Sequence, residues 1–216
     1  MSFRAALFDM DGTLIYIFDL WRGLLASYLK PFGAVLSEED FHEAMSLPYD
    51  KLAVYLQSKF SLPKTPQEIM DEIDALSIEE YADRATVKQG VAAFTQDLFE
   101  KGMVLSIVTT NLGEIAEKVL KRFGMSSYFS HVYGTHELRH KKIFPECFLD
   151  IAQRIGVPPQ ECVVFEDSPA VAESAKAAGM HVVGILGEQT ETSRKALVEI
   201  ADQVITSYYD EVNLNV

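Results

Sequence analysis

Two carboxylates near the start of the chain have a spacing that suits chemistry. Asp9 and Asp11 follow the apolar run Ala5–Phe8, which predicts a buried strand, and Gly12 comes directly after them. Residues two apart in an extended chain point to the same side, so both carboxylates can face one small volume. Like charges that close repel each other unless a cation or a shared proton lies between them. The pair suits a hard cation such as Mg²⁺, or a nucleophile beside a general acid/base, and a turn with solvated carboxylates is the alternative.

A second acidic pair follows another apolar run. Cys162–Phe165 predicts a buried strand, and Glu166 and Asp167 come next, just before a helix start at Pro169. Acidic residues at a helix start are often simple caps, because they complement the helix dipole. Together with the first pair, however, these carboxylates would form an oxygen-only site of the kind typical of Mg²⁺.

Polar residues also follow the apolar run Val104–Val108. Thr109, Thr110 and Asn111 stand between this predicted strand and a predicted helix. Hydroxyls and backbone N–H groups at a helix N-terminus favour a bound anion. An ordinary helix cap is the competing interpretation.

An anion site in this chain needs its own local positive charge. The formal net charge is −13, which argues against nucleic acid and anionic membranes as partners. Lys141 and Lys142 stand just before a helix start at Pro145. Adjacent lysines are usually solvated surface, but a fixed cation at this place would suit the charged oxygens of a phosphoryl group.

The elements that carry these residues alternate regularly from about residue 87 onward. Apolar runs predict strands over residues 104–108, 130–134, 162–165, 182–186 and 203–205. Helices are expected over residues 90–101, 112–123, 145–155, 169–178 and 192–200. Continuous apolar strands alternating with helices predict an α/β fold, a Rossmann-like parallel sheet core with helices on both faces.

Residues from about 16 to 84 do not show this alternation of strands and helices. Helices are expected over residues 19–30, 37–45, 49–60 and 66–84, with a break at Pro48 and a capping box at Thr65 and Glu68. No convincing strand is expected in this block, which predicts a small helical bundle. We therefore expect a core domain of residues 1–15 and 85–216, interrupted by a helical cap domain of residues 16–84.

The motifs resemble those of one known superfamily. Asp9-Met10-Asp11-Gly12-Thr13 resembles the first motif of the haloacid dehalogenase-like phosphohydrolases, and the strand that ends at Thr109 is similar to their second. Lys142 stands three residues before Pro145, as in the third motif, although Ile143 replaces a Pro that is common there. Glu166-Asp167-Ser168 resembles the fourth. The helical block resembles a type-one cap, and the whole chain is similar to the branch of phosphoglycolate phosphatase-like and β-phosphoglucomutase-like proteins.

The resemblance implies a phosphatase that hydrolyses a small phosphate monoester through an aspartyl-phosphate. Asp9 would be the nucleophile and Asp11 the general acid/base. Thr109 would hydrogen-bond the transferring phosphoryl group, helped by the backbone of Thr110 and Asn111. The cap would close over the site before chemistry.

The same resemblance implies a magnesium ion and an active-site lysine. Mg²⁺ would be held by Asp9, the backbone carbonyl of Asp11, and Asp167. Glu166 would orient waters or the lysine from behind the metal ligands. Lys142 would bridge the nucleophile and the phosphoryl oxygens, and Lys141 is the second choice for this role.

Several other functions fit the same scaffold. A β-phosphoglucomutase-like mutase is the first alternative, but Tyr16, Ile17 and Trp21 stand where mutases carry polar residues, and the loop 46–51 lacks an Arg for a second phosphate. A dehalogenase would not keep Asp11. Phosphonate cleavage would need a cap lysine, for which Lys51 is the one tempting candidate. A non-catalytic phosphate-binding or regulatory protein is the alternative from another class, and the intact motifs argue against it.

Composition is typical of an ordinary soluble globular protein. The chain has 216 residues, 48% of them hydrophobic, and its two Cys are far apart, which fits a reducing cytoplasm. No signal peptide and no membrane span are expected from the apolar pattern. The expected partner is a small-molecule phosphate ester, and the sequence is compatible with a monomer or a homodimer.

Overall fold

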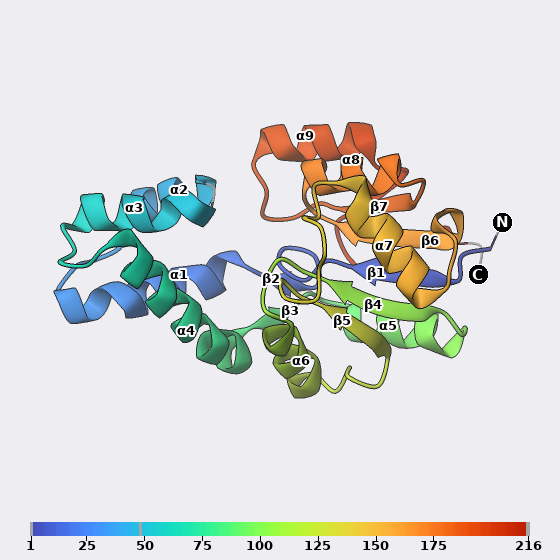
Figure 1. Ribbon diagram of the computed structural model, residues 1–216, viewed down its shortest axis with the longest axis horizontal. Coiled ribbons are helices and arrows are strands. Elements are labelled where there is room, and N and C mark those ends of the chain that lie inside the picture. Colours follow the sequence, from blue (N-terminus) through green and yellow to red (C-terminus); the bar gives the residue numbers. More distant parts are fainter. Residues whose placement is uncertain (1, 48, 215–216) are drawn as a thin grey trace. The chain divides into compact units, whose positions relative to one another are not determined.

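A parallel β-sheet organises the larger part of the molecule. The computed structural model describes residues 2–47 and 49–214 (Figure 1). Within them, the sheet has the strand order β5-β4-β1-β6-β7-β8, and every neighbouring pair is parallel. Its strands are β1 (Ala5–Phe8), β4 (Val104–Val108), β5 (Phe129–Tyr133), β6 (Cys162–Glu166), β7 (His181–Ile185) and β8 (Gln203–Ile205). The α/β class and the parallel sheet expected from the sequence are confirmed.

Helices cover both faces of this sheet. Figure 1 shows α8 and α9 on one side of the strands and α5 and α6 on the other. The helices are α5 (Val91–Glu100), α6 (Gly113–Arg122), α7 (Pro145–Ile155), α8 (Pro169–Ala177) and α9 (Glu191–Ile200). Each begins and ends within one residue of the range that the sequence predicts. Both faces of the sheet are covered, which explains why its strands read as continuous apolar runs.

The central strand shows how the two faces divide the core. Ala5 and Leu7 pack into an apolar cluster with α7, α8 and α9. Phe8 points to the other face, where its ring stacks on that of Phe165 at 4.4 Å between centroids and meets Phe94 of α5 edge-on. Successive side chains of a strand point to opposite faces, so this short strand contributes to both halves of the core.

The strand order places β1 where the direction of the chain reverses. After β4 and β5 are added on one side of β1, the chain crosses over and adds β6, β7 and β8 on the other. Ligands of open α/β sheets bind beyond the carboxyl ends of the strands at such a switch point. The loops that follow β1, β4 and β6 meet there.

Residues Phe18–Ala85 form a separate compact unit of helices, and residues up to Ile17 and from Thr86 form the other unit. The helical unit contains α1 (Phe18–Leu29), a 3-10 turn at Lys30–Phe32, α2 (Glu38–Ser46), α3 (Tyr49–Phe60) and α4 (Pro66–Arg84). Capping boxes open α2 and α4, because Ser37 pairs with Asp40 and Thr65 with Glu68. Leucine, phenylalanine and isoleucine side chains fill the centre of this unit. Pro48, expected to separate two helices, lies outside the described residues.

A small antiparallel sheet was not expected. The sequence predicts that strand structure stops after Leu14, but β2 (Ile15–Tyr16) pairs with β3 (Thr86–Val87), so the expectation of no strand from residue 16 is wrong at Tyr16. Two-residue strands show no period of their own, and this pair forms only because the fold brings the segments together. Among the described residues, no helix is long and apolar enough to cross a membrane.

Candidate active site at the carboxyl edge of the sheet

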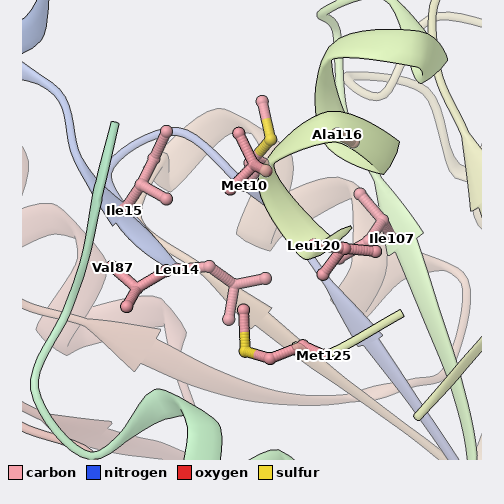
Figure 2. Close-up of a pocket in the computed structure, with 9 residues that line it drawn as sticks. Met10, Leu14, Ile15, Val87, Ile107, Ala116, Leu120 and Met125 are labelled. Carbon is pink, nitrogen blue, oxygen red and sulfur yellow. The ribbon is translucent and has the colours of Figure 1, made fainter. Parts of the chain in front are cut away.

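Asp9 stands at the first position beyond the central strand. Its backbone N–H donates to the carbonyl of Phe165 at 3.0 Å, which continues the pairing between β1 and β6. The next side chain, Met10, turns into a cavity of about 10 Å³ with an entirely apolar lining (Figure 2). So small a space without polar partners stays dry, so the cavity is a packing gap and not a ligand site. Because Met10 turns inward, its neighbours Asp9 and Asp11 are directed away from this gap.

The loop after Asp11 is folded back tightly on itself. The carbonyl of Met10 accepts N–H donors from Thr13, Leu14 and Ile15 at 3.3, 2.9 and 3.1 Å. Gly12 has φ +79°, and a Cβ on it would lie 2.2 Å from Oδ2 of Asp167. A side chain cannot occupy that space, so glycine is required for the first acidic motif to approach the second.

A buried lysine joins the two acidic motifs. Nζ of Lys142 lies 2.6 Å from Oδ1 of Asp9 and 2.9 Å from Oε2 of Glu166, and all three side chains are buried. Burial opposes the charge of Lys142, but the two carboxylates outweigh it and raise its pKa. Lys141 is exposed. The structure thus brings Lys142, and not Lys141, to the acidic group.

The carboxylates themselves are crowded. Burial and the nearby charge of Glu166 raise the pKa of Asp9 to about 7, although Lys142 acts in the opposite direction. Burial, Glu166 and Asp9 together raise the pKa of Asp167 well above its usual range. The ammonium of Lys142 does not offset these upward pKa shifts of Asp9 and Asp167, and a bound metal cation would relieve the repulsion.

The acidic group could hold a metal ion. Ligand oxygens of Asp9, Glu166 and Asp167 all lie within 4.8 Å of one another. Glu166 is already engaged, because Oε1 accepts the N–H groups of Asp167 and Ser168 at 3.1 and 3.0 Å and Oε2 faces Lys142. Oδ2 of Asp9, by contrast, is buried without a hydrogen-bond partner among the described residues. Asp9 and Asp167 therefore fit the ligands of a hard cation, with Glu166 supporting them.

The predicted phosphate-binding residues follow β4. Thr109 is fully buried, its N–H donates to the carbonyl of Tyr133 at 2.9 Å, and its hydroxyl oxygen accepts the N–H of Asn111 at 3.1 Å. Nδ2 of Asn111 donates to Oδ2 of Asp11 at 3.2 Å. The backbone carbonyl of Thr110 accepts a hydrogen bond from the hydroxyl of Thr135. The structure thus places Thr109 and Asn111 at the site, with the Asn111 side chain turned to Asp11.

Sequence reasoning missed two residues that hold the first motif. Nζ of Lys88 donates to the carbonyl of Gly12, and the hydroxyl of Tyr208 donates to the carbonyl of Thr13 at 3.3 Å. Both side chains are buried. Lys88 stands alone before a helix start and Tyr208 lies in a weakly patterned tail, so neither position carries a signal in the sequence.

Comparison with known proteins gives this site a family context. The family model described as haloacid dehalogenase-like hydrolase matches residues 6–185. A probable pseudouridine-5'-phosphatase from Drosophila melanogaster is 29% identical, with 90% of this chain and 89% of the relative covered. A fructose-1-phosphate phosphatase from Escherichia coli is 27% identical, with 85% of this chain and 96% of the relative covered.

Solved structures share the fold. A putative β-phosphoglucomutase from Thermotoga maritima superposes with a TM-score of 0.82 at 23% identity, covering 94% of both chains. A predicted phosphoglycolate phosphatase from Haemophilus somnus superposes with a TM-score of 0.83 at 19% identity, covering 97% of this chain and 96% of that one. At these sequence identities the superpositions show a shared fold and nothing about function.

Proposed function

The chain belongs to the haloacid dehalogenase-like hydrolase family, as a hydrolase of phosphoric monoesters, and we propose that it is a magnesium-dependent phosphatase acting through an aspartyl-phosphate. The observation that carries this proposal is the buried Asp9 carboxylate. One of its oxygens is held by Lys142 and the other is left without a hydrogen-bond partner among the described residues. A carboxylate whose orientation is fixed by a buried lysine suits nucleophilic attack.

The first half of the reaction forms the covalent intermediate. The Asp9 carboxylate attacks phosphorus, the new O–P bond forms as the bond to the leaving oxygen breaks, and Asp11 donates a proton to that oxygen. Nζ of Lys142, already 2.6 Å from Oδ1 of Asp9, fixes the orientation of the carboxylate and presents positive charge where phosphoryl charge gathers.

The second half regenerates the enzyme. Asp11, now deprotonated, takes a proton from the water that attacks the aspartyl-phosphate, and the O–P bond to Asp9 breaks. Nδ2 of Asn111 holds Oδ2 of Asp11 in this role. The hydroxyl of Thr109, which accepts the N–H of Asn111, has its own proton left to donate to a phosphoryl oxygen.

Asp9 and Asp167 would hold the magnesium ion, together with the backbone carbonyl of Asp11. When bound, Mg²⁺ would offset the repulsion between the Asp9 carboxylate and the phosphate. The buried Oδ2 of Asp9 and the raised pKa of both carboxylates support the fit of these residues to a cation. Glu166 and Lys142 would keep the two acidic motifs aligned from the buried side.

The substrate class that we propose is a small phosphorylated sugar or sugar alcohol. The relatives support this choice, because they include proteins named hexitol phosphatase, fructose-1-phosphate phosphatase and phosphorylated carbohydrates phosphatase. The pseudouridine-5'-phosphatase relative also has a phosphorylated sugar ring in the substrate that its name states.

The test is phosphate release from a panel of sugar phosphates, hexitol phosphates and nucleoside 5'-monophosphates, with Mg²⁺ and with EDTA. We expect release that EDTA abolishes, and a loss of about 10⁴-fold or more in Asp9→Asn, because that variant lacks the nucleophile. Asp11→Asn keeps the nucleophile but lacks the proton donor and acceptor, so it should still form the aspartyl-phosphate, more slowly, and turnover should fall about 10²–10⁴-fold.

Trapping the intermediate separates this mechanism from direct attack by water. Acid-quenched Asp11→Asn should carry substrate-derived phosphate on Asp9, detected by mass spectrometry. Full activity of Asp9→Asn, or turnover that EDTA leaves unchanged, would contradict the proposal.

A further inference from the structure

Lys88 is a second buried cation beside the acidic group, and the mechanism above does not use it. It comes directly after β3 and the residue is 8% exposed. Its N–H donates to the carbonyl of Leu14 at 2.8 Å, and its Nζ donates to the carbonyl of Gly12. Lys88 therefore holds the loop that follows Asp9 and Asp11 from two sides.

The surroundings of this ammonium are acidic. Burial lowers the pKa of Lys88, and the carboxylates of Asp167, Glu188 and Asp9 act in the opposite direction, in that order. Gly12 is the common neighbour, since its carbonyl accepts a hydrogen bond from Lys88 and a Cβ added to it would meet Oδ2 of Asp167. The Lys88 ammonium and Asp167, a predicted metal ligand, therefore adjoin the same residue, Gly12.

A second glycine makes room for the lysine. A Cβ on Gly187 would lie 2.9 Å from Nζ of Lys88. The next residue, Glu188, accepts the backbone N–H of Ile17 at 2.7 Å through Oε2. The ring of Tyr16 lies 5.8 Å from Nζ, at the distance of a cation–π contact. The pocket for the ammonium is therefore built by the 187–188 loop, β2 and the Gly12 loop together.

We propose that Lys88 is a positioning residue of the phosphatase site, which fixes the Gly12 loop and supplies positive charge beside Asp167. The inference rests on the proposed magnesium site. Its ammonium partly balances the acidic group before Mg²⁺ enters, and it repels Mg²⁺ once the ion is bound. Lys88 thereby weakens metal binding and keeps the ion exchangeable.

The test is the affinity for Mg²⁺ itself, measured by calorimetric titration of the full chain without substrate. Lys88→Met removes the charge, and Lys88→Gln removes it while keeping an N–H donor for the Gly12 carbonyl. We expect both neutral variants to bind Mg²⁺ about fivefold or more tightly, the lower end of typical coupling between sites. Lys88→Arg should keep the affinity of the unaltered protein. If Lys88→Met fails to fold, the Mg²⁺ affinity of Lys88→Gln tests the inference.

Two controls separate charge from structure. Lys118→Met removes a charge from an exposed position of α6, and we expect no change in Mg²⁺ affinity. Tyr208→Phe removes the hydrogen bond to the next carbonyl of the same loop without changing charge, so it should not tighten Mg²⁺ binding. In activity assays, the Mg²⁺ concentration for half-maximal rate should fall in Lys88→Gln.

The outcomes distinguish this inference from the proposed function. An unaltered protein that hydrolyses sugar phosphates with Mg²⁺, beside a Lys88→Gln variant of equal or weaker Mg²⁺ affinity, would overturn the role of Lys88 alone. An unaltered protein that neither binds Mg²⁺ nor releases phosphate would overturn both.

Discussion

One ionic group of the α/β unit differs in its burial from the ion pairs of the helical unit. In the α/β unit, Lys142, Asp9 and Glu166 form a connected ionic group whose side chains are 3%, 9% and 2% exposed. In the helical unit, each ion pair that joins the described residues has at least one partner more than 40% exposed, such as Lys59 with Asp40 and Glu72 with Lys64. The charged groups of the buried cluster are shielded from water, whereas each ion pair of the helical unit keeps at least one partner in contact with water.

This difference indicates where the chemistry lies. Removing an ion from water costs several kcal/mol, so a buried ionic group persists only where its geometry compensates or a function requires it. An exposed pair contributes about 0–1 kcal/mol and needs no functional reason. The desolvation cost of buried charge therefore falls at the carboxyl edge of the sheet. The charges of the helical unit cap helices or lie at its surface.

The largest contrast is expected between the two kinds of lysine. Lys142→Met leaves two buried carboxylates without their cation, so we expect a loss of about 3–5 kcal/mol in the free energy of unfolding. Lys64→Met breaks a surface pair and should cost at most about 1 kcal/mol. Urea denaturation followed by circular dichroism measures both.

Lys141→Met is the matched control for this comparison, because Lys141 is adjacent in sequence and exposed. It should leave stability within about 0.5 kcal/mol of the unaltered protein. Equal losses of unfolding free energy in Lys142→Met and Lys64→Met would contradict the expected difference between buried and exposed ion pairs.

A smaller effect is expected from the contact between Asn111 and Asp11. Asn111→Ala removes a hydrogen bond to a carboxylate, an interaction of about 1.5–3 kcal/mol, so kcat should fall about tenfold or more. A double-mutant cycle with Asp11→Asn checks the cause, since the Asn111→Ala effect should largely disappear in that background. Full additivity would mean that Asn111 acts elsewhere.

A smaller stability effect is expected from the helix cap at Thr65 in the helical unit. The hydroxyl of Thr65 accepts the N–H of Glu68 at 3.3 Å, and Glu68 accepts the N–H of Thr65 at 2.8 Å. Thr65→Ala should therefore cost about 1 kcal/mol of stability. Thr65→Ser keeps the hydroxyl and should cost less than Thr65→Ala in the same urea titration.

The smallest expected effect is a dependence of stability on pH within the helical unit. Hydrogen bonds from Lys59 and Ser37 lower the pKa of Asp40 below its ordinary value of 3.8. The unfolded state then binds more protons than the folded one between the two values, so this contribution is present above pH 3.8 and is lost as pH falls through the lower folded value. Asp40→Asn should flatten the acid limb of a plot of melting temperature against pH, and an unchanged limb would contradict the assignment.

Local pattern was sufficient to predict most of the elements. The apolar runs ending at Phe8, Val108 and Phe165 are strands, and the capping boxes at Ser37 and Thr65 open helices where they were expected. These features depend on residues within one or two turns of chain, so neighbours in sequence encode them. The fold class follows, because alternating buried strands and helices leave few other arrangements.

The motifs likewise showed which acids and hydroxyls stand at strand ends, but not what each one touches. The backbone of Asn111 was expected to help bind phosphate, which stays a prediction, whereas the contact of its side chain with Asp11 was not predicted. The roles of the site residues in catalysis and metal binding stay predictions. Their contacts depend on how separate strands are placed side by side, which no local pattern records.

The α/β architecture with its inserted helices, and the candidate acids at the ends of its strands, could be predicted from the sequence. That Lys142 and not Lys141 enters the acidic group, and that β2 pairs with β3, became known from the three-dimensional structure. It alone revealed Lys88 and Tyr208 beneath the Gly12 loop. The difference follows from distance along the chain, because strand and helix formation depend on near neighbours, whereas Asp9 and Lys142 are 133 residues apart and meet only when the sheet has formed.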